Sequence, residues 1–267
     1  MPDPVSLNGR ILPASGACIP ATDRGFLLGD GLFETIRIRQ RGPVALDRHL
    51  ARLAAGLKTL GFGRLPFDPA PALADLLNAG SVTEGVARLT VSRGPAPRGV
   101  LPPESPVLTV LITAAAMMPI VSPARLVVAR TTRRNQHSPL SRLKTMNYGD
   151  SILARREAEA ARVDDAILRN TDGNVSETSA ANLVFRFADA WITPPVADGA
   201  LPGTARARLL DAGLIAERRI TASELVQAEA GFVVSALTLR PIAAVDSRNL
   251  ATPGTEAFVA FSDVLEM

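Results

Sequence analysis

Residues 141–160 read SRLKTMNYGDSILARREAEA and contain Lys144, one of only two lysines in a chain that has 27 arginines. Lys144 precedes a polar turn and a helical pattern, and the single tyrosine of the chain, Tyr148, follows four residues later. Lysine can lose a proton at modest cost and form a Schiff base, whereas a guanidinium stays protonated in proteins. The segment therefore predicts a reactive lysine. The simpler alternative is that Lys144 is a surface lysine on a loop, without a chemical role.

The composition is that of a globular chain of ordinary polarity. Its 267 residues, 47% hydrophobic and 21% charged, suffice for one large or two moderate domains. The net charge of +3 reflects arginine usage, and the densest basic run, residues 130–142, lacks the interleaved aromatic residues that bind single-stranded nucleic acid. We therefore expect a site for small anionic molecules and no nucleic-acid partner.

Targeting and cross-linking signals are also missing from the sequence. The segment MPDPVSLNGR does not read as a signal peptide, and no stretch reaches the roughly 18 apolar residues of a membrane span. The single cysteine, Cys18, allows no internal disulfide. We expect a cytoplasmic protein without a membrane partner.

Hydrophobic spacing in the first half predicts strands mixed with helices. Asn8-Gly9 within residues 5–12 indicates a hairpin. Residues 33–39, FETIRIR, predict a strand with Phe33, Thr35 and Arg37 on one face. Leucines at helical spacing predict a helix over residues 46–62, with Asp47 as the N-cap and Gly61 as the stop. Residues 68–80, with proline near the first turn, predict a second helix.

The second half is expected to begin within residues 113–123, where small residues and prolines interrupt the pattern. A helix is predicted over residues 148–161 and an antiparallel meander over residues 166–195. A turn and helix follow at LPGTARARLL, residues 201–210, and a terminal helix lies near residues 255–267. The fold class is therefore mixed α/β (α+β).

Four features match the needs of one cofactor, pyridoxal 5'-phosphate. Lys144 offers an amine for a Schiff base, Glu177 a carboxylate for the ring nitrogen, and Arg52 a cation for the phosphate. The helix that starts after Gly203 offers backbone N–H groups, which favour a phosphate. No metal is expected.

Five ordered motifs resemble the class-IV pyridoxal-phosphate enzymes, which include branched-chain and D-amino-acid aminotransferases and 4-amino-4-deoxychorismate lyases. They are HLARL (49–53), KTMNY (144–148), ETSAAN (177–182), LPGTAR (201–206) and SALTLRPI (235–242). The resemblance implies a homodimer of fold type IV. Each chain would have a small N-terminal α/β domain, residues 1–115, and a larger cofactor-binding domain with a curled β-sheet, residues 116–267.

The resemblance also implies roles for individual residues. Lys144 would bind the cofactor covalently and move protons, Glu177 would pair with the pyridine nitrogen, and Tyr148 would hydrogen-bond the phenolic oxygen. Asn182 would support the site beside Glu177. The phosphate would be held by Arg52, Ser235 and the backbone of Thr204 and Ala205. Family members commonly carry LPGIT where this chain has LPGTA, so residue 205 has no hydroxyl to contribute.

The reaction is harder to predict than the cofactor. The SRGPAPRG segment and SAL favour an aminodeoxychorismate lyase, which releases pyruvate and 4-aminobenzoate by β-elimination. Thr35 would assist catalysis, and Arg37, Arg98 and Ala236 would bind the substrate, whose carboxylates suit arginine.

An aminotransferase acting on branched-chain L-amino acids, D-amino acids or (R)-amines is the alternative, because FETIR resembles the FEGIR of branched-chain enzymes. However, the strand ARLTVSRG lacks their tyrosine, and Val100 stands where D-amino-acid enzymes carry histidine. An anion-binding regulatory module without chemistry would require Lys144 to be silent.

Overall fold

The computed structural model describes residues 3–117 and 122–267 and divides the chain into two compact units. The first unit comprises Met1–Met118 and Lys144–Asn147, and the second comprises Pro119–Leu143 and Tyr148–Met267. The segment around Lys144 thus belongs to the first unit although the chain on both sides of it belongs to the second. The expected boundary region, residues 113–123, includes residues 118–121, which lie outside the described residues.

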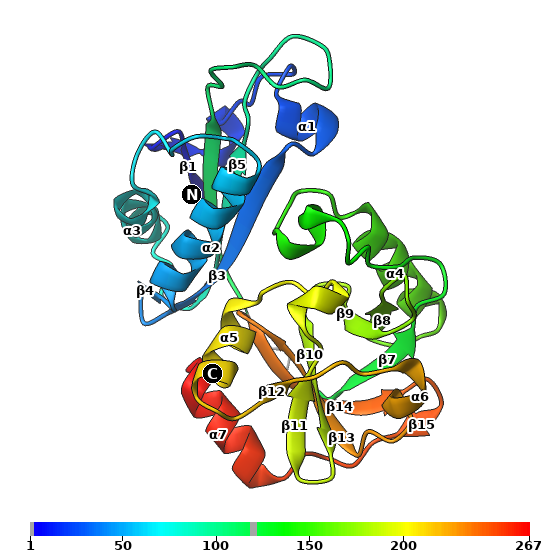
Figure 1. Cartoon of the computed structure of the whole chain (residues 1–267). Coiled ribbons are helices and arrows are strands. Elements are labelled where there is room, and N and C mark those ends of the chain that lie inside the picture. The colour runs from blue at the N-terminus through cyan, green and yellow to red at the C-terminus, as the bar shows by residue number, and fades with distance from the viewer. Residues whose placement is uncertain (1–2, 118–121) are drawn as a thin grey trace. The chain divides into compact units, whose positions relative to one another are not determined.

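The first unit contains a six-stranded sheet with the strand order β2-β1-β6-β5-β3-β4. The predicted hairpin around Asn8-Gly9 is confirmed as the antiparallel pair β1–β2, and β3 pairs along its length with β5. Figure 1 shows this unit in blue to green. Its elements are β1 (Pro4–Leu7), β2 (Arg10–Pro13), η1 (Ala14–Gly16), α1 (Arg24–Leu28), β3 (Gly31–Arg39), β4 (Gly42–Pro43), α2 (Leu46–Thr59), α3 (Pro69–Ala79), β5 (Gly85–Ser92) and β6 (Thr109–Ala116).

Helices α2 and α3 form within the predicted ranges. Helix α2 buries Leu53 and Leu57, and α3 buries Leu73, Leu76 and Leu77. The predicted N-cap of α2 is wrong. Ala45, in the left-handed conformation with φ 50°, precedes the helix, and Asp47 lies inside its first turn. A carboxylate in the first turn still suits the positive end of the helix dipole. At the other end the helix stops before Gly61, whose φ of +65° favours glycine.

The second unit contains a nine-stranded sheet with the order β12-β11-β10-β13-β14-β7-β8-β9, and β15 pairs with β14 off this path. Its strands are β7 (Ala124–Val128), β8 (Asp165–Arg169), β9 (Val175–Thr178), β10 (Asn182–Phe187), β11 (Ala190–Thr193), β12 (Ala216–Glu217), β13 (Ala230–Ser235), β14 (Thr238–Val245) and β15 (Arg248–Asn249). Its helices are η2 (Pro139–Arg142), α4 (Gly149–Ala160), η3 (Val196–Asp198), α5 (Thr204–Asp211), α6 (Ala222–Leu225) and α7 (Thr255–Leu265).

This sheet must curl, because only the three residues 179–181 join β9 to β10, whereas four other strands lie between these two in the sheet order. In a flat sheet, strands so placed would lie about 24 Å apart at the usual spacing. A three-residue link spans at most about 14 Å. The predicted meander is therefore only partly correct: β8 pairs with β9 and β10 with β11, but β10 then pairs with β13.

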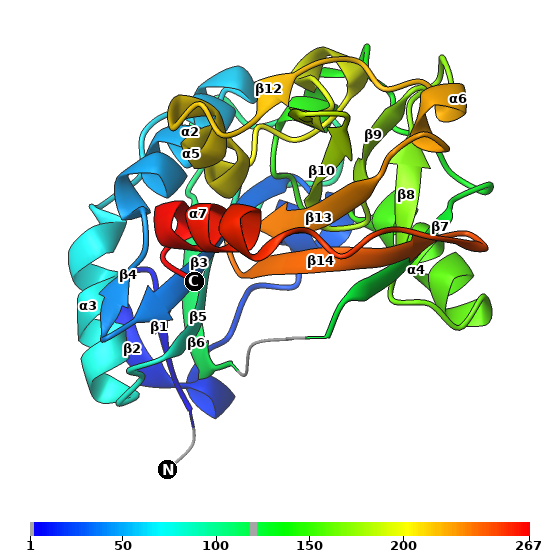
Figure 2. The same ribbon diagram turned by 90° about the horizontal axis from the view of Figure 1, so that it is seen from below.

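Two apolar clusters lie on the curled sheet. One joins residues of β7, β8, β9, β10, β13 and β14 with Ile220 and Leu225, and the other joins β10, β13 and β14 with α5 and α7. Figure 2 shows α7, in red, beside β13 and β14. Helix α4 packs Ala154 and Ala158 onto β8. Within the described residues, every helix is too short or too polar to span a bilayer.

Candidate active site

The segment that carries Lys144 attaches to the beginning of β3. The backbone N–H of Phe33 donates to the carbonyl of Lys144 at 2.9 Å, and the N–H of Met146 donates to the carbonyl of Gly31 at 2.9 Å. Leu32 and Thr145 form the antiparallel bridge between these bonds. The backbone of Lys144 is therefore fixed by a strand more than 100 residues earlier in the chain.

The ring of Phe33 lies beside two cations. Nζ of Lys144 is 4.6 Å from the ring centroid, and the guanidinium carbon of Arg88 is 3.6 Å from it. Arg88 lies on β5 directly across from Thr35, so Thr35 shares this face of the sheet with Phe33. The face thus combines an amine, a guanidinium and a hydroxyl around one aromatic ring.

Arg88 is a residue that the sequence analysis missed. The predicted strand ARLTV placed it opposite β3, but only the register shows that it faces Thr35. Arg37 lies on the same face of β3, about 13 Å along the strand from Phe33 at the usual rise per residue. Arg98 is exposed on the loop between β5 and β6.

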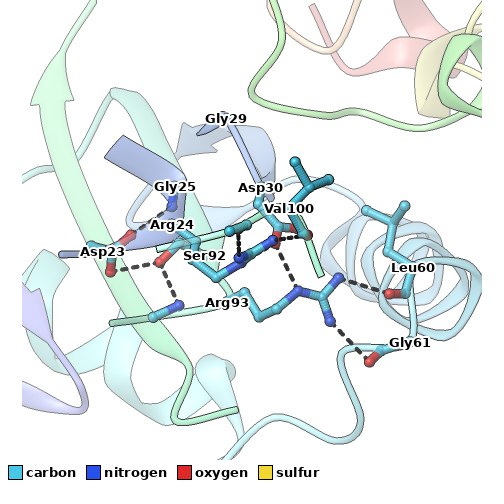
Figure 3. Close-up of polar contacts among 12 residues, drawn as sticks. Asp23, Arg24, Gly25, Gly29, Asp30, Leu60, Gly61, Ser92, Arg93 and Val100 are labelled. Atoms are coloured by element: carbon cyan, nitrogen blue, oxygen red, sulfur yellow. Dashed lines mark hydrogen bonds and ion pairs between the residues drawn. The ribbon is translucent and has the colours of Figure 1, made fainter. Parts of the chain in front are cut away.

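The other arginine of that loop, Arg93, is a structural residue. Its Nε and the Nε of Arg24 both donate to Oδ2 of Asp30, at 2.8 and 2.7 Å. Arg93 also donates to the carbonyls of Leu60 and Gly61, and Arg24 donates to those of Gly99 and Val100, as Figure 3 shows for part of this cluster. Asp30 therefore ties the loop that carries Arg98 to the beginning of β3.

On the opposite face of β3, Glu34 is buried and binds two residues of α2. His49 Nδ1 lies 2.6 Å from Oε2 of Glu34, and Arg52 donates from Nε to Oε1 at 2.9 Å and from Nη2 to Oε2 at 2.5 Å. Burial raises the pKa of Glu34, but the bonds from His49 and Arg52 outweigh it and leave the pKa below its usual value. Arg52, expected at a phosphate, is thus held by a carboxylate of the adjacent strand.

In the second unit, Glu177 lies on β9 with its carboxylate held from two sides. Arg134 Nε lies 3.0 Å from Oε1, and the backbone N–H of Leu201 donates to Oε2 at 2.9 Å. Arg134 also donates to the carbonyls of Gly199 and Ser141. The sequence analysis missed Arg134, because nothing distinguishes it from the other arginines until the fold places it beside Glu177.

Two of the predicted phosphate residues, Thr204 and Ala205, form the beginning of α5 in the second unit. Asn182 on β10 donates from Nδ2 to the carbonyl of Leu201 at 2.9 Å, so it supports the residue that also binds Glu177. Gly203 immediately precedes α5, and a Cβ there would lie 2.0 Å from Oδ1 of Asn182. The backbone can therefore approach this point only because residue 203 has no side chain.

Ala205 packs in the cluster that joins α5 to β13, and Ser235 is the last residue of β13. Oγ of Ser235 accepts from the N–H of Leu237 at 3.1 Å, and Ala236 lies in the turn between β13 and β14. Thr204, the first residue of α5, is buried. Tyr148, half-buried, is the N-cap of α4.

The comparisons with known proteins give the family. The model of the family described as amino-transferase class IV matches residues 31–245, which are most of the chain. This chain belongs to the class-IV aminotransferase family. The resemblance noted in the sequence is confirmed, as is the mixed α/β fold with two units and a curled sheet, and the protein is an enzyme.

Individual relatives in this family differ in activity. The chain is 28% identical over 260 residues to the D-alanine aminotransferase of Bacillus licheniformis, covering 93% of this chain and 90% of that protein. It is 31% identical over 258 residues to the branched-chain-amino-acid aminotransferase-like protein 2 of Arabidopsis thaliana, covering 91% of this chain. The chain spans only about half, 46%, of that plant protein.

Among solved structures, the 4-amino-4-deoxychorismate lyase of Pseudomonas aeruginosa matches with a TM-score of 0.84 and 28% identity, covering 98% of this chain and all of that one. Lyases and aminotransferases are thus similar to this chain at comparable identity. The choice between the two reactions must come from the residues.

The residues of this class-IV enzyme fit pyridoxal phosphate. Glu177 is a nearly buried carboxylate held by Arg134, and a carboxylate is the group that would face the pyridine nitrogen of the cofactor. Gly203 leaves its backbone open at the start of a helix, where a phosphate is favoured. Lys144 and Arg52 supply an amine and a cation in the first unit. Among the residues described, no group of three or more His, Cys, Asp or Glu side chains is placed to hold a metal ion.

Proposed function

We propose that this enzyme is a pyridoxal-phosphate-dependent 4-amino-4-deoxychorismate lyase. The observation that carries the proposal is the face of β3 and β5 on which Lys144 and Arg88 flank Phe33 and Thr35 lies opposite Arg88. A substrate with two carboxylates suits a face rich in guanidinium groups. Thr35 adds a hydroxyl at the position where the branched-chain motif FEGIR has glycine.

Each residue has a defined task in this proposal. Lys144 would bind the cofactor and accept the proton from the amine-bearing carbon at its Nζ. The hydroxyl of Thr35 would protonate the departing pyruvate fragment, directly or through a water. Arg88, Arg37 and Arg98 would bind the carboxylates, with Ala236 lining the substrate side. When bound, pyridoxal phosphate would supply the electron sink for the negative charge that develops on the amine-bearing carbon as its proton is removed.

The proposed cofactor contacts follow the same family pattern. Glu177, oriented by Arg134 and Leu201, would face the ring nitrogen, with Asn182 supporting Leu201, and Tyr148 would bind the phenolic oxygen. The phosphate would lie at the start of α5, held by Arg52, Ser235 and the backbone of Thr204 and Ala205. The elimination is balanced without a co-substrate, because the atoms of aminodeoxychorismate are recovered in 4-aminobenzoate and pyruvate.

An aminotransferase remains the second candidate, because relatives of this activity match over the same residues. In that reaction Lys144 would perform the same proton transfer, and a keto acid would accept the amino group. Exposed apolar side chains, Phe26 on α1 and Val100 and Leu101 on the loop between β5 and β6, support the further expectation of a homodimer. Sedimentation of the purified chain would test it, and a monomeric holoenzyme would contradict it. The cytoplasmic location stays a prediction.

A substrate panel separates the two reactions. The enzyme is incubated with aminodeoxychorismate, and separately with L-leucine, D-alanine or (R)-phenylethylamine plus a keto acid. We expect 4-aminobenzoate and pyruvate from the first and no keto product from the others. Turnover of any of the three amines without 4-aminobenzoate production from aminodeoxychorismate would overturn the lyase proposal.

The cofactor assignment has its own control, because the chain has only two lysines. Borohydride reduction in the presence of pyridoxal phosphate should attach a pyridoxyl group to the Lys144 peptide. Lys58→Ala, on the exposed surface of α2, should leave labelling and activity unchanged, whereas Lys144→Ala should abolish both. Labelling of Lys58 alone would contradict the cofactor assignment.

A further inference from the structure

A fully buried carboxylate lies between β3 and α2 in the first unit. The side chain of Glu34 is 1% exposed, as is that of His49, and the side chain of Arg52 is 13% exposed. The neighbours of Glu34 on the same face of β3 are the apolar residues Ile36 and Ile38. A carboxylate in such a place loses its hydration and is tolerated only when its hydrogen bonds are made.

Stability alone does not explain this arrangement. Replacing a buried ion pair with apolar residues of similar volume is often neutral or stabilising. What an apolar residue cannot do is bind a guanidinium at two points. Glu34 accepts from Nε and Nη2 of Arg52, and these two parallel bonds define both the position and the plane of the guanidinium.

His49 restrains the carboxylate in turn. His49 and Arg52 are three residues apart on α2, so they lie on one face of the helix, and both reach Glu34. With Oε2 shared between the imidazole and the guanidinium, the rotation of the Glu34 carboxylate is fixed from the helix side. The three side chains therefore form a chain of restraints that ends at Arg52.

We propose that Glu34, fixed by His49, is the residue that positions Arg52 to bind the phosphate of the cofactor. The proposal rests on the proposed function, in which Arg52 contacts that phosphate. A long arginine side chain loses much rotational freedom when it binds an anion, and a guanidinium that is already oriented loses less. Glu34 and His49 would thus raise phosphate affinity without touching the phosphate.

The test compares two ligands that differ only in the phosphate. Equilibrium binding of pyridoxal phosphate and of pyridoxal to the apoenzyme is measured for the wild type, Arg52→Gln, Glu34→Gln and His49→Gln. Because a hydrogen bond to a charged group is involved, we expect Glu34→Gln to weaken pyridoxal phosphate by about tenfold to a hundredfold. Binding of pyridoxal should stay nearly unchanged, and His49→Gln should show the same pattern more weakly.

A matched control is Asp30→Asn, which perturbs a half-buried carboxylate with two arginine partners in the same unit. It should lower the unfolding temperature without changing the ratio of the two affinities. If Glu34→Gln weakens both ligands equally, its role is only structural and the inference is wrong. The inference also fails if Arg52→Gln removes the preference for the phosphate and both Glu34→Gln and His49→Gln keep it.

Failure of the proposed function would look different. In that case the wild-type apoenzyme would bind pyridoxal phosphate no more tightly than pyridoxal, or Arg52→Gln would leave the preference intact. Unfolding curves of each apoprotein show whether a variant is folded before its binding is interpreted. Should Glu34→Gln not fold, His49→Gln decides the inference by the same ratio.

Discussion

Phe33 contacts Lys144 twice, through a backbone hydrogen bond of 2.9 Å and through its ring, whose centroid lies 4.6 Å from Nζ. The next residue of the strand, Glu34, holds Arg52. Two adjacent residues of β3 therefore place both the predicted cofactor lysine and the predicted phosphate arginine, on opposite faces of one strand. This arrangement explains why a segment distant in sequence carries the lysine back to the first unit.

The first prediction concerns the fit of this segment against Gly31. A Cβ at residue 31 would lie 2.3 Å from Sδ of Met146 and 2.8 Å from the carbonyl oxygen of Val91. The methionine could move, but the strand backbone of β5 could not. We expect Gly31→Ala to lower the free energy of unfolding by about 1–3 kcal/mol and to reduce labelling of Lys144 by pyridoxal phosphate and borohydride.

Gly16→Ala is the matched control, because a Cβ at Gly16 would meet nothing within 4 Å. Denaturant unfolding and mass spectrometry of the labelled peptide measure the two effects. Equal stability and equal Lys144 labelling in the two variants would show that the lysine segment does not depend on the contact at Gly31.

The second prediction concerns Arg88. The guanidinium of Arg88 lies over the ring of Phe33, which Lys144 also contacts, whereas Arg37 lies farther along β3. We therefore expect Arg88 to bind a carboxylate of the substrate. Arg88→Gln should raise KM for aminodeoxychorismate by about tenfold to a hundredfold, the loss of one charge-assisted bond. Arg37→Gln and Arg98→Gln should have smaller effects. A larger effect of either one would assign the carboxylate to that arginine instead.

The third prediction is a pH dependence of stability from Glu34, whose charged and titratable partners are Arg52 and His49. Its pKa is lower in the folded chain than its usual value, so the folded state favours the ionised form. The stabilisation is therefore complete above the usual glutamate pKa of about 4.3 and disappears as the pH falls through the lowered folded value.

At neutral pH the free energy of unfolding of the wild type should exceed that of Glu34→Gln by about 1–3 kcal/mol. The wild type should therefore unfold at a higher temperature. This difference should close in strong acid. Asp30, Glu157 and Asp164, whose pKa values are also lowered, titrate in both proteins and cancel in the difference. A difference that stays constant down to strong acid would show that Glu34 does not act through its charge.

The sequence could predict features that depend on neighbouring residues better than contacts between segments that are distant in the chain. The helices α2 and α5 and the strand β3 follow from patterns within a few residues. The candidates Lys144, Arg52 and Glu177 likewise lie in short motifs that resemble those of the family. The partners of these residues come from elsewhere in the chain. Arg134 reaches Glu177 across more than 40 residues, and with 27 arginines no local signal marks it. Arg88 likewise acquires its meaning only from the register of β5 on β3.

The pairing of β10 shows the same limit for the fold. Alternating residues and short turns predicted that β9 and β10 would be neighbours, because consecutive strands usually pair. The sheet instead curls, and β13, more than 40 residues later, takes the place beside β10. Asn182 begins β10 at this point, opposite Val234. Non-local pairing thus decides which residues surround the start of α5.

The last prediction tests that region through Gly203. A Cβ at residue 203 would lie 2.0 Å from Oδ1 of Asn182. The amide of Asn182 donates to the carbonyl of Leu201, and the backbone N–H of Leu201 donates to Glu177. We expect Gly203→Ala to break the Asn182 bond, to destabilise the apoenzyme by about 1–3 kcal/mol and to weaken pyridoxal phosphate. Gly149→Ala, where a Cβ at the start of α4 would meet nothing within 4 Å, is the control for the alanine itself.

Truncating Asn182 distinguishes a steric clash at residue 203 from a general loss of backbone freedom. In the double variant Gly203→Ala with Asn182→Ala, the added Cβ no longer meets the Asn182 amide and keeps only an ordinary contact of 3.6 Å with Cβ of Arg206. Part of the stability lost in Gly203→Ala should therefore return, although the bond to Leu201 stays absent. Because the two residues are in contact, their effects on the unfolding free energy should be non-additive. Strict additivity would mean that Gly203 is needed for a reason other than the close approach of Asn182.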